Sequence, residues 1–193
     1  MVKKKDNSIY FILFILIMSQ LMGPSVWAET QTYPELNAES AILMDASTGT
    51  VLYEKNIHEA LPPASVTKIM TMLLAMEALE SNTITLEDKV VISERASSMG
   101  GTQIYVEPGE VQTVENLMKS IAIRSANDAS VAIAEHISGT EEIFVERMNN
   151  RAKELNMNNT LFINTNGLPA PNFISSFKIT SFINLHSPFL VYS

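Results

Sequence analysis

The chain of 193 residues has no cysteine, and its three histidines are scattered. Without cysteine there are no disulfide bonds and no thiolate metal sites, which is compatible with export. His58, His136 and His186 form neither an H-x-x-x-H nor an H-x-H pattern, so a zinc hydrolase is poorly supported. We therefore expect no metal site and no cofactor.

Basic side chains are also few. The chain carries 13 Lys and Arg against 21 Asp and Glu, which gives a formal net charge of −8. Because nucleic-acid binding depends on neutralising phosphates with Lys and Arg, we do not expect nucleic acid as a partner.

A long hydrophobic run is missing too, since the apolar stretch from Ile9 to Met18 is short for a membrane span. Lys3 to Lys5 precede this stretch, and Val26-Trp27-Ala28 follows it as a small-residue cleavage site. We predict that residues 1–28 are a secretory signal peptide. Membrane attachment is expected only through an uncleaved form of this segment. Its removal leaves enough chain for one domain.

The most informative motif is Ser65-Val66-Thr67-Lys68, which stands behind two prolines and in front of the apolar run from Ile69 to Met76. The prolines favour a helix that begins at about Ser65. Residues three apart lie on one face of a helix, so we expect the Lys68 amine to reach the Ser65 hydroxyl. The following run is apolar around nearly its whole circumference, which is typical of a helix enclosed on all sides.

Burial and the positive end of the helix dipole both disfavour the ammonium form of Lys68, so we expect its pKa to fall toward neutrality. A fall of roughly three units corresponds to about 4 kcal/mol, which is within the range known for buried lysines. A neutral amine can take the proton of Ser65, while free N–H groups at the helix start favour negative charge nearby. Ser175-Ser176-Phe177-Lys178 has the same spacing but no helix-start signal, and we interpret it as accidental.

The rest of the pattern predicts an α+β domain in which strands come first and helices follow. Two strands of a hairpin are expected at 41–45 and 50–54, and further short strands at 89–93 and 103–106. A turn is expected at Pro108-Gly109, and helices at 65–80, 114–123, 128–137 and 140–156.

Ser125-Ala126-Asn127 lies between two of these helices, where a tight loop could present a hydroxyl and a carboxamide toward Ser65. Taken alone, these residues fit a loop serine and a helix cap. Together with Ser65 and Lys68, they resemble the serine D-alanyl-D-alanine carboxypeptidases of the low-molecular-weight penicillin-binding protein type, which are peptidase S11-like. In this superfamily an S-x-x-K motif accompanies S-D-N and K-T-G. The resemblance runs from about Ala38 to Pro169 and rests on Asp45 to Leu52, Pro62 to Thr71, Gly100 to Thr102, Ser125 to Ala129 and Asn166 to Leu168.

The resemblance implies a β-lactamase/transpeptidase-like helical cluster on an antiparallel sheet, with residues 29–169 as the N-terminal part of a penicillin-binding/transpeptidase-like domain. It implies that Ser65 is the acyl-forming nucleophile and Lys68 its general base. Ser125 would relay a proton to the leaving amine, and Asn127 would hold the peptide backbone of the substrate. The implied substrate is a peptidoglycan stem peptide ending in D-Ala-D-Ala, outside the cytoplasm at the cell wall or the outer face of the cytoplasmic membrane. β-Lactams would acylate Ser65 as mimics of that dipeptide.

The third family motif, K-T-G, does not occur in this sequence. Lys178-Ile179-Thr180 lacks the glycine and shows no strand context. In the family, the strand that carries this motif supplies one N–H of the oxyanion hole, and losing one such donor costs about 2.7 to 4 kcal/mol. We interpret residues 170–193 as a tail that departs from the family after a frameshift or premature stop, with the C-terminal sheet strands missing.

Two interpretations of function follow. The first is a secreted D-Ala-D-Ala carboxypeptidase that removes the terminal D-Ala through an acyl-enzyme. The alternative is a truncated, catalytically dead remnant that binds peptidoglycan or β-lactams weakly. A serine β-lactamase ranks lower, because the sequence offers no clear candidate for the glutamate that activates the deacylating water in class A enzymes.

Overall fold

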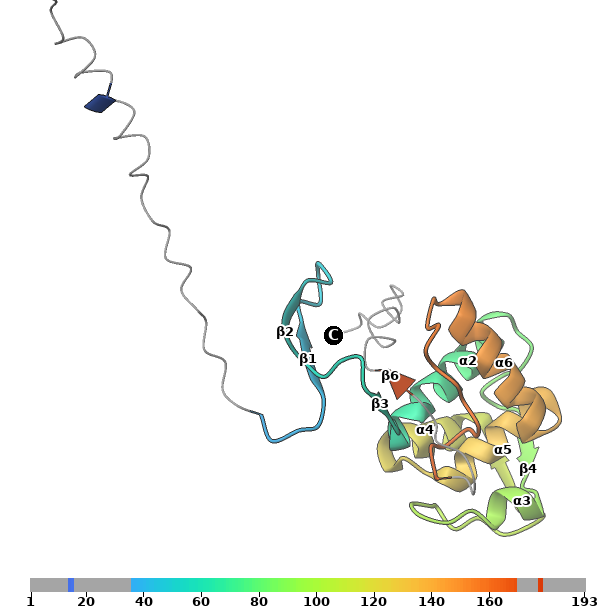
Figure 1. Ribbon diagram of the computed structural model, residues 1–193. Coiled ribbons are helices and arrows are strands. Elements are labelled where there is room, and N and C mark those ends of the chain that lie inside the picture. The colour runs from blue at the N-terminus through green and yellow to red at the C-terminus, as the bar shows by residue number, and fades with distance from the viewer. Residues whose placement is uncertain (1–13, 16–35, 170–176, 179–193) are drawn as a thin grey trace, which may run out of the picture. The chain divides into compact units, whose positions relative to one another are not determined.

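The computed structural model describes residues 14–15, 36–169 and 177–178 (Figure 1). The chain divides into two units, Met1–Glu35 and Leu36–Ser193. Apart from Phe14 and Ile15, which are helical, the predicted signal peptide lies outside the described residues, and so does most of the predicted tail over 170–193. Within the described ranges, no helix combines the length and the apolar character that a bilayer crossing requires.

The predicted hairpin is present as β1 (Ala41–Met44) and β2 (Val51–Lys55), which pair antiparallel. Its turn is organised by the carboxylate of Asp45, whose Oδ1 accepts hydrogen bonds from the hydroxyls of Ser47 and Thr48 and from the N–H of Thr48, at 2.7 to 2.8 Å. These bonds favour the ionised form and lower the pKa of Asp45 to about 2.

Two further strand pairs belong to the same unit. β3 (Ala60–Leu61) pairs with β6 (Phe177–Lys178), and β4 (Lys89–Val91) pairs with β5 (Val111–Thr113), both antiparallel. The α+β class is confirmed, although the described strands form three two-stranded sheets instead of one. The expectation that Lys178 lacks a strand context is wrong, because it pairs with Ala60 in β3.

The helix predicted behind the prolines consists of a single 3-10 turn, η1 (Ala64–Thr67), followed by α2 (Lys68–Glu80). One side of α2 is buried against α4, α5 and α6, and it includes Met70 and Leu74. Ile69 and Met76 on the other side are 38% and 55% exposed. The prediction of a helix enclosed on all sides is therefore wrong, because the described elements cover only part of its circumference.

The remaining long helices are α4 (Val114–Arg124), α5 (Asn127–Ser138) and α6 (Glu141–Glu154), close to their predicted ranges. α4 and α6 begin at threonine N-caps, where Thr113 and Thr140 accept hydrogen bonds from backbone N–H groups in the first turn. α5 is the most enclosed of the three, since every residue from Asn127 to Ala134 is buried. A short helix that the sequence pattern did not predict, α3 (Glu94–Ser97), follows β4 and is capped by Ser93.

The strand predicted over 103–106 is absent, because another group takes its amides. The fully buried carboxylate of Asp128 accepts hydrogen bonds from the N–H groups of Ile104 and Tyr105, at 3.0 and 2.9 Å. Tyr105 has a φ of +60°, which is incompatible with a strand. Residues 103–107 are consequently an irregular segment fastened to the first turn of α5.

Candidate active site

Ser65 and Lys68 are in contact at the junction of η1 and α2. The Lys68 Nζ donates a long hydrogen bond of 3.4 Å to the Ser65 Oγ and a shorter one of 2.9 Å to the backbone carbonyl of Asn166. Ser65 is exposed, whereas Lys68 is only 4% exposed. The predicted contact is therefore present, and it joins a solvent-accessible hydroxyl to a buried amine.

Burial lowers the pKa of Lys68 from its ordinary value of 10.5 to about 8. The direction agrees with the sequence-based expectation, although the value remains above neutrality. In the described part of the chain, the groups that face Nζ are the Ser65 hydroxyl and the Asn166 carbonyl, and no carboxylate pairs with it. At pH 7 about one amine in ten is then neutral and able to accept a proton.

The loop that supplies the Asn166 carbonyl also fits tightly against the start of η1. Gly167 has a φ of +81°, and a Cβ atom at this position would overlap the carbonyl oxygen of Ala64. Two residues earlier, the Thr165 carbonyl accepts a hydrogen bond of 2.6 Å from the Thr71 hydroxyl. Sequence reasoning included Asn166 and Gly167 among the matching segments but gave them no role. Their positions are fixed by contacts with Lys68 and Ala64, about a hundred positions earlier in the chain.

Ser125 lies in the tight turn between α4 and α5. It ends α4 in a left-handed conformation, with φ +56° and ψ +37°, and its N–H donates to the Ile121 carbonyl at 3.0 Å. A non-glycine residue with left-handed φ and ψ angles carries backbone strain. Such strained residues are found often at functional sites. Among the described residues, no hydrogen bond joins the Ser125 side chain to Ser65 or Lys68.

Asn127 begins α5 and is held by the glycine segment, residues 100–102, which precedes α4 in the chain. Its N–H donates to the Thr102 carbonyl at 2.8 Å, and its side-chain Nδ2 donates to the Gly100 carbonyl at 2.7 Å. Gly101 between them has a φ of +75°, and a Cβ there would lie 2.8 Å from Nδ2. The side chain is therefore fixed through its amide nitrogen, which leaves its Oδ1 as the group able to accept a further hydrogen bond.

Asp128, one residue further on, was missed by sequence reasoning. Its buried carboxylate fastens the segment that follows the glycines to α5, as described above, and its Oδ1 also accepts from the N–H of Ala129 at 2.8 Å. An acidic residue in the first turn of a helix is the signal that could have indicated this role. The turn that carries Ser125 and Asn127 is therefore held by hydrogen bonds within α4 and by hydrogen bonds to the segment over residues 100–105.

Residues 27–185 match the family model for D-alanyl-D-alanine carboxypeptidase. The chain is 54% identical over 168 residues to D-alanyl-D-alanine carboxypeptidase DacF of Bacillus subtilis, which covers 85% of this chain and 43% of DacF. It is 38% identical over 164 residues to DacC of Escherichia coli, covering 81% of this chain and 41% of that protein. The chain therefore spans less than half the length of these curated relatives.

Solved structures give the same result for the fold. DacD from Francisella tularensis superposes with a TM-score of 0.76 at 35% identity, over 83% of this chain and 39% of that one. Penicillin binding protein 5 from Haemophilus influenzae gives a TM-score of 0.73 at 34% identity, over 80% of this chain and 46% of that one. The resemblance drawn from the motifs is confirmed, and the chain belongs to the D-alanyl-D-alanine carboxypeptidase family.

Proposed function

We propose that this protein is a serine D-Ala-D-Ala carboxypeptidase that removes the terminal D-Ala from peptidoglycan stem peptides through an acyl-enzyme. The observation that carries the proposal is the contact between the exposed Ser65 hydroxyl and the buried Lys68 amine. An amine with a pKa of about 8 exchanges its proton near physiological pH, as a general base must.

In the proposed reaction, the neutral Lys68 amine takes the proton of Ser65 as the Ser65 Oγ attacks the carbonyl carbon of the penultimate D-Ala. The C–N bond to the terminal D-Ala then breaks, and Ser125 relays the proton from Lys68 to the departing amine. Water hydrolyses the resulting ester, which returns the proton to Ser65 and releases the shortened peptide. The reaction consumes one water and requires no metal or organic cofactor.

Substrate positioning is the proposed role of Asn127. Its Nδ2 already donates to the Gly100 carbonyl, so its Oδ1 is the group to accept an N–H of the stem peptide. The fixed side chain costs little conformational entropy when it binds, since its rotamer is set by the glycine segment.

β-Lactams are the proposed covalent inhibitors, because they mimic the D-Ala-D-Ala end and would acylate Ser65. This proposal is supported by penicillin-binding protein D2 from Listeria monocytogenes, which was solved in an ampicillin-bound form. That protein superposes on this chain with a TM-score of 0.68 at 27% identity, over 80% of this chain and 62% of its own.

Peptidoglycan lies outside the cytoplasm, so the proposed location is extracytoplasmic, at the cell wall or the outer face of the cytoplasmic membrane. Export would depend on residues 1–28, which the sequence predicts as a signal peptide. An uncleaved signal segment is the proposed route to any membrane attachment.

Labelling with a fluorescent penicillin tests the proposal on the full chain. We expect covalent label on the wild type and none on Ser65→Ala, because that change removes the attacking oxygen. Ser175→Ala is a matched control, since it alters the second S-x-x-K motif and should leave labelling unchanged. Folded wild-type protein that takes no label would instead support the remnant without a K-T-G strand.

A further inference from the structure

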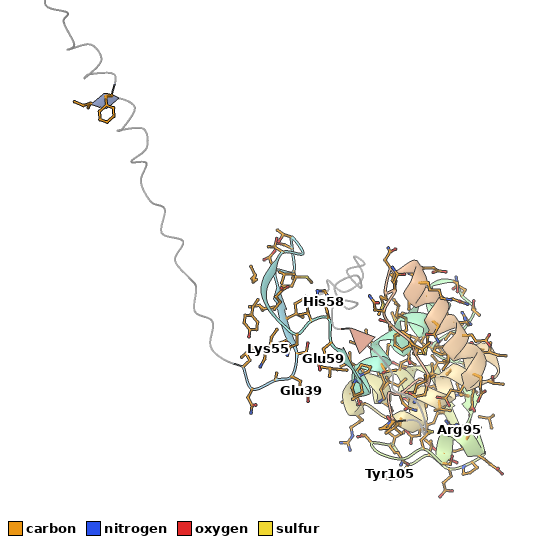
Figure 2. The ribbon with its side chains drawn as sticks, in the orientation of Figure 1. Glu39, Lys55, His58, Glu59, Arg95 and Tyr105 are labelled. Atoms are coloured by element: carbon orange, nitrogen blue, oxygen red, sulfur yellow. The ribbon has the colours of Figure 1, made fainter. Side chains whose placement is uncertain are left out.

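Glu141, the first residue of α6, has a carboxylate that is buried and not used in the proposed reaction. The residue is 5% exposed. Its Oε2 accepts two hydrogen bonds from the guanidinium of Arg95, from Nε at 3.2 Å and from Nη2 at 2.8 Å. Arg95 belongs to α3 on the helical body (Figure 2) and is more than half exposed. A buried carboxylate needs such a partner, because desolvation of an unpaired charge costs several kcal/mol.

The other oxygen of Glu141 binds the loop beside the candidate active site. Oε1 accepts from the Thr165 hydroxyl at 2.9 Å and from the Thr165 N–H at 3.2 Å. Thr165 is completely buried. One carboxylate therefore uses both of its oxygens to join α6 to α3 and to this loop, through partners 46 and 24 positions away from it in the sequence.

Thr165 and Asn166 pass this restraint to α2. The Thr165 carbonyl accepts from the Thr71 hydroxyl at 2.6 Å, and the Asn166 carbonyl accepts from the Lys68 Nζ at 2.9 Å. Lys68 and Thr71 are three residues apart, so their side chains lie on one face of α2. The two consecutive carbonyls thus hold the loop against that face, and the buried Lys68 amine contacts the Asn166 carbonyl on one hand and the Ser65 Oγ of η1 on the other.

We propose that Glu141 is a positioning residue that holds the Asn166 carbonyl on the Lys68 amine by anchoring Thr165. This inference deepens the proposed function, because it names the residue that keeps the general base enclosed. A carboxylate suits the role since it accepts from Thr165 and from Arg95 at once, whereas a neutral amide would turn an N–H group toward one of these donors.

Release of the loop changes the surroundings of Lys68 in a measurable way. Water would reach the amine, and the desolvation that lowers its pKa would weaken. The groups that face Nζ in the described part of the chain, the Ser65 hydroxyl and the Asn166 carbonyl, carry no charge that could offset this effect. Loss of the anchor should therefore raise the pKa of Lys68 toward 10.5.

The test is the titration of the Lys68 amine in the full chain. Competitive acetylation at a series of pH values, measured by mass spectrometry, gives the pH at which half of the amine is neutral. In Glu141→Gln we expect the midpoint to rise by about one pH unit relative to the wild type. Glu142→Gln is the matched control: it makes the same change one residue away, at an exposed position, and should leave the midpoint unchanged. An unchanged midpoint in folded Glu141→Gln protein would overturn the proposal.

A second variant covers the case in which Glu141→Gln does not fold. Thr165→Val removes one of the two hydrogen bonds from Thr165 to the carboxylate and leaves the Arg95 pair intact. We expect a smaller rise of the Lys68 midpoint in the same direction, and no rise would contradict the anchor. Glu77→Gln, which breaks the separate Arg151 pair, controls for the loss of an ion pair as such.

Penicillin acylation provides the catalytic measurement. A rise of about one unit lowers the neutral fraction of Lys68 at pH 7 about tenfold, so the acylation rate of Glu141→Gln should fall about tenfold with non-covalent penicillin affinity unchanged. If the wild type takes no penicillin but the Lys68 midpoint still rises in Glu141→Gln, the proposed function fails while the positioning role of Glu141 stands. If acylation occurs and neither the midpoint nor the rate responds, the positioning role fails alone.

Discussion

Lys68 is a buried amine whose charged form lowers the stability of the folded chain. It is the first residue of α2 and is almost completely buried, with an uncharged carbonyl as its closest partner. The folded chain releases its proton at about pH 8, whereas the unfolded chain keeps it until about pH 10.5. Between these values the unfolded state binds more protons, so the free energy of unfolding rises with pH. Below pH 8 the buried ammonium costs about 3 kcal/mol.

Replacing Lys68 with methionine should remove this cost and its pH dependence. We expect the free energy of unfolding of Lys68→Met to exceed that of the wild type at pH 7. The gain is the cost of the buried ammonium minus about 1 kcal/mol, because the substitution leaves the Asn166 carbonyl unpaired. Toward pH 10 the difference in free energy of unfolding between variant and wild type should fall by about 2 to 3 kcal/mol, because the wild-type amine is then neutral. Urea unfolding of both proteins at the two pH values measures the difference. A difference that does not depend on pH would show that the Lys68 pKa is not lowered by folding.

At the scale of elements, the contact between the 164–168 loop and η1 depends on a glycine. Gly167 combines a φ of +81° with an approach to Ala64 that leaves no room for a Cβ atom. Ala64 itself has a φ of +48°, so both sides of the contact have conformations that L side chains rarely adopt. The loop therefore reaches the serine turn only because residue 167 has no side chain.

Gly167→Ala should consequently destabilise the chain by about 2 to 4 kcal/mol and slow penicillin labelling, since the loop or the serine turn must move. Gly139→Ala is the matched control. Gly139 has a similar φ of +84° but no atom within 4 Å of its would-be Cβ, so the substitution should cost only about 1 kcal/mol and leave labelling unchanged. Thermal and urea unfolding provide the stabilities, and equal losses in the two variants would contradict the close contact.

The elements themselves were largely predictable from the sequence. The ranges predicted for α4 and α6 lie within a few residues of the observed ones, and the proline pair located the start of η1. The strand expected at 103–106 was wrong because the carboxylate of Asp128, more than twenty residues later, takes the amides that a strand would need. Local pattern contains no information on a partner at that separation.

At the scale of the whole molecule, a hydrophobic cluster packs α2, which carries Lys68, against α5 and α6. Phe144 on α6 is completely buried in a cluster with Met70 and Leu74 on α2. Met70 lies two residues from Lys68, so the same core that stabilises the chain also fixes the helix that carries Lys68.

Phe144→Ala should therefore destabilise the whole unit by about 3 to 5 kcal/mol, through lost burial and the cavity it leaves. Ile143→Ala changes the adjacent residue, which is 48% exposed, and should cost less than about 1 kcal/mol. Urea unfolding checks both values. Similar losses in the two variants would mean that Phe144 is not part of a close-packed core.

The sequence by itself determined the spacing of Ser65 and Lys68, the helix that begins there, and the family to which the chain belongs. The spacing and the helix depend on neighbouring residues, which helix geometry relates in a known way. The family depends on several short motifs, each of which can be read from the sequence without knowing how they meet in space. Only the tertiary structure decided that the Asn166 carbonyl meets the Lys68 amine and that Glu141 binds Thr165. Both contacts join residues distant in the chain, so their geometry arises from packing and not from local pattern.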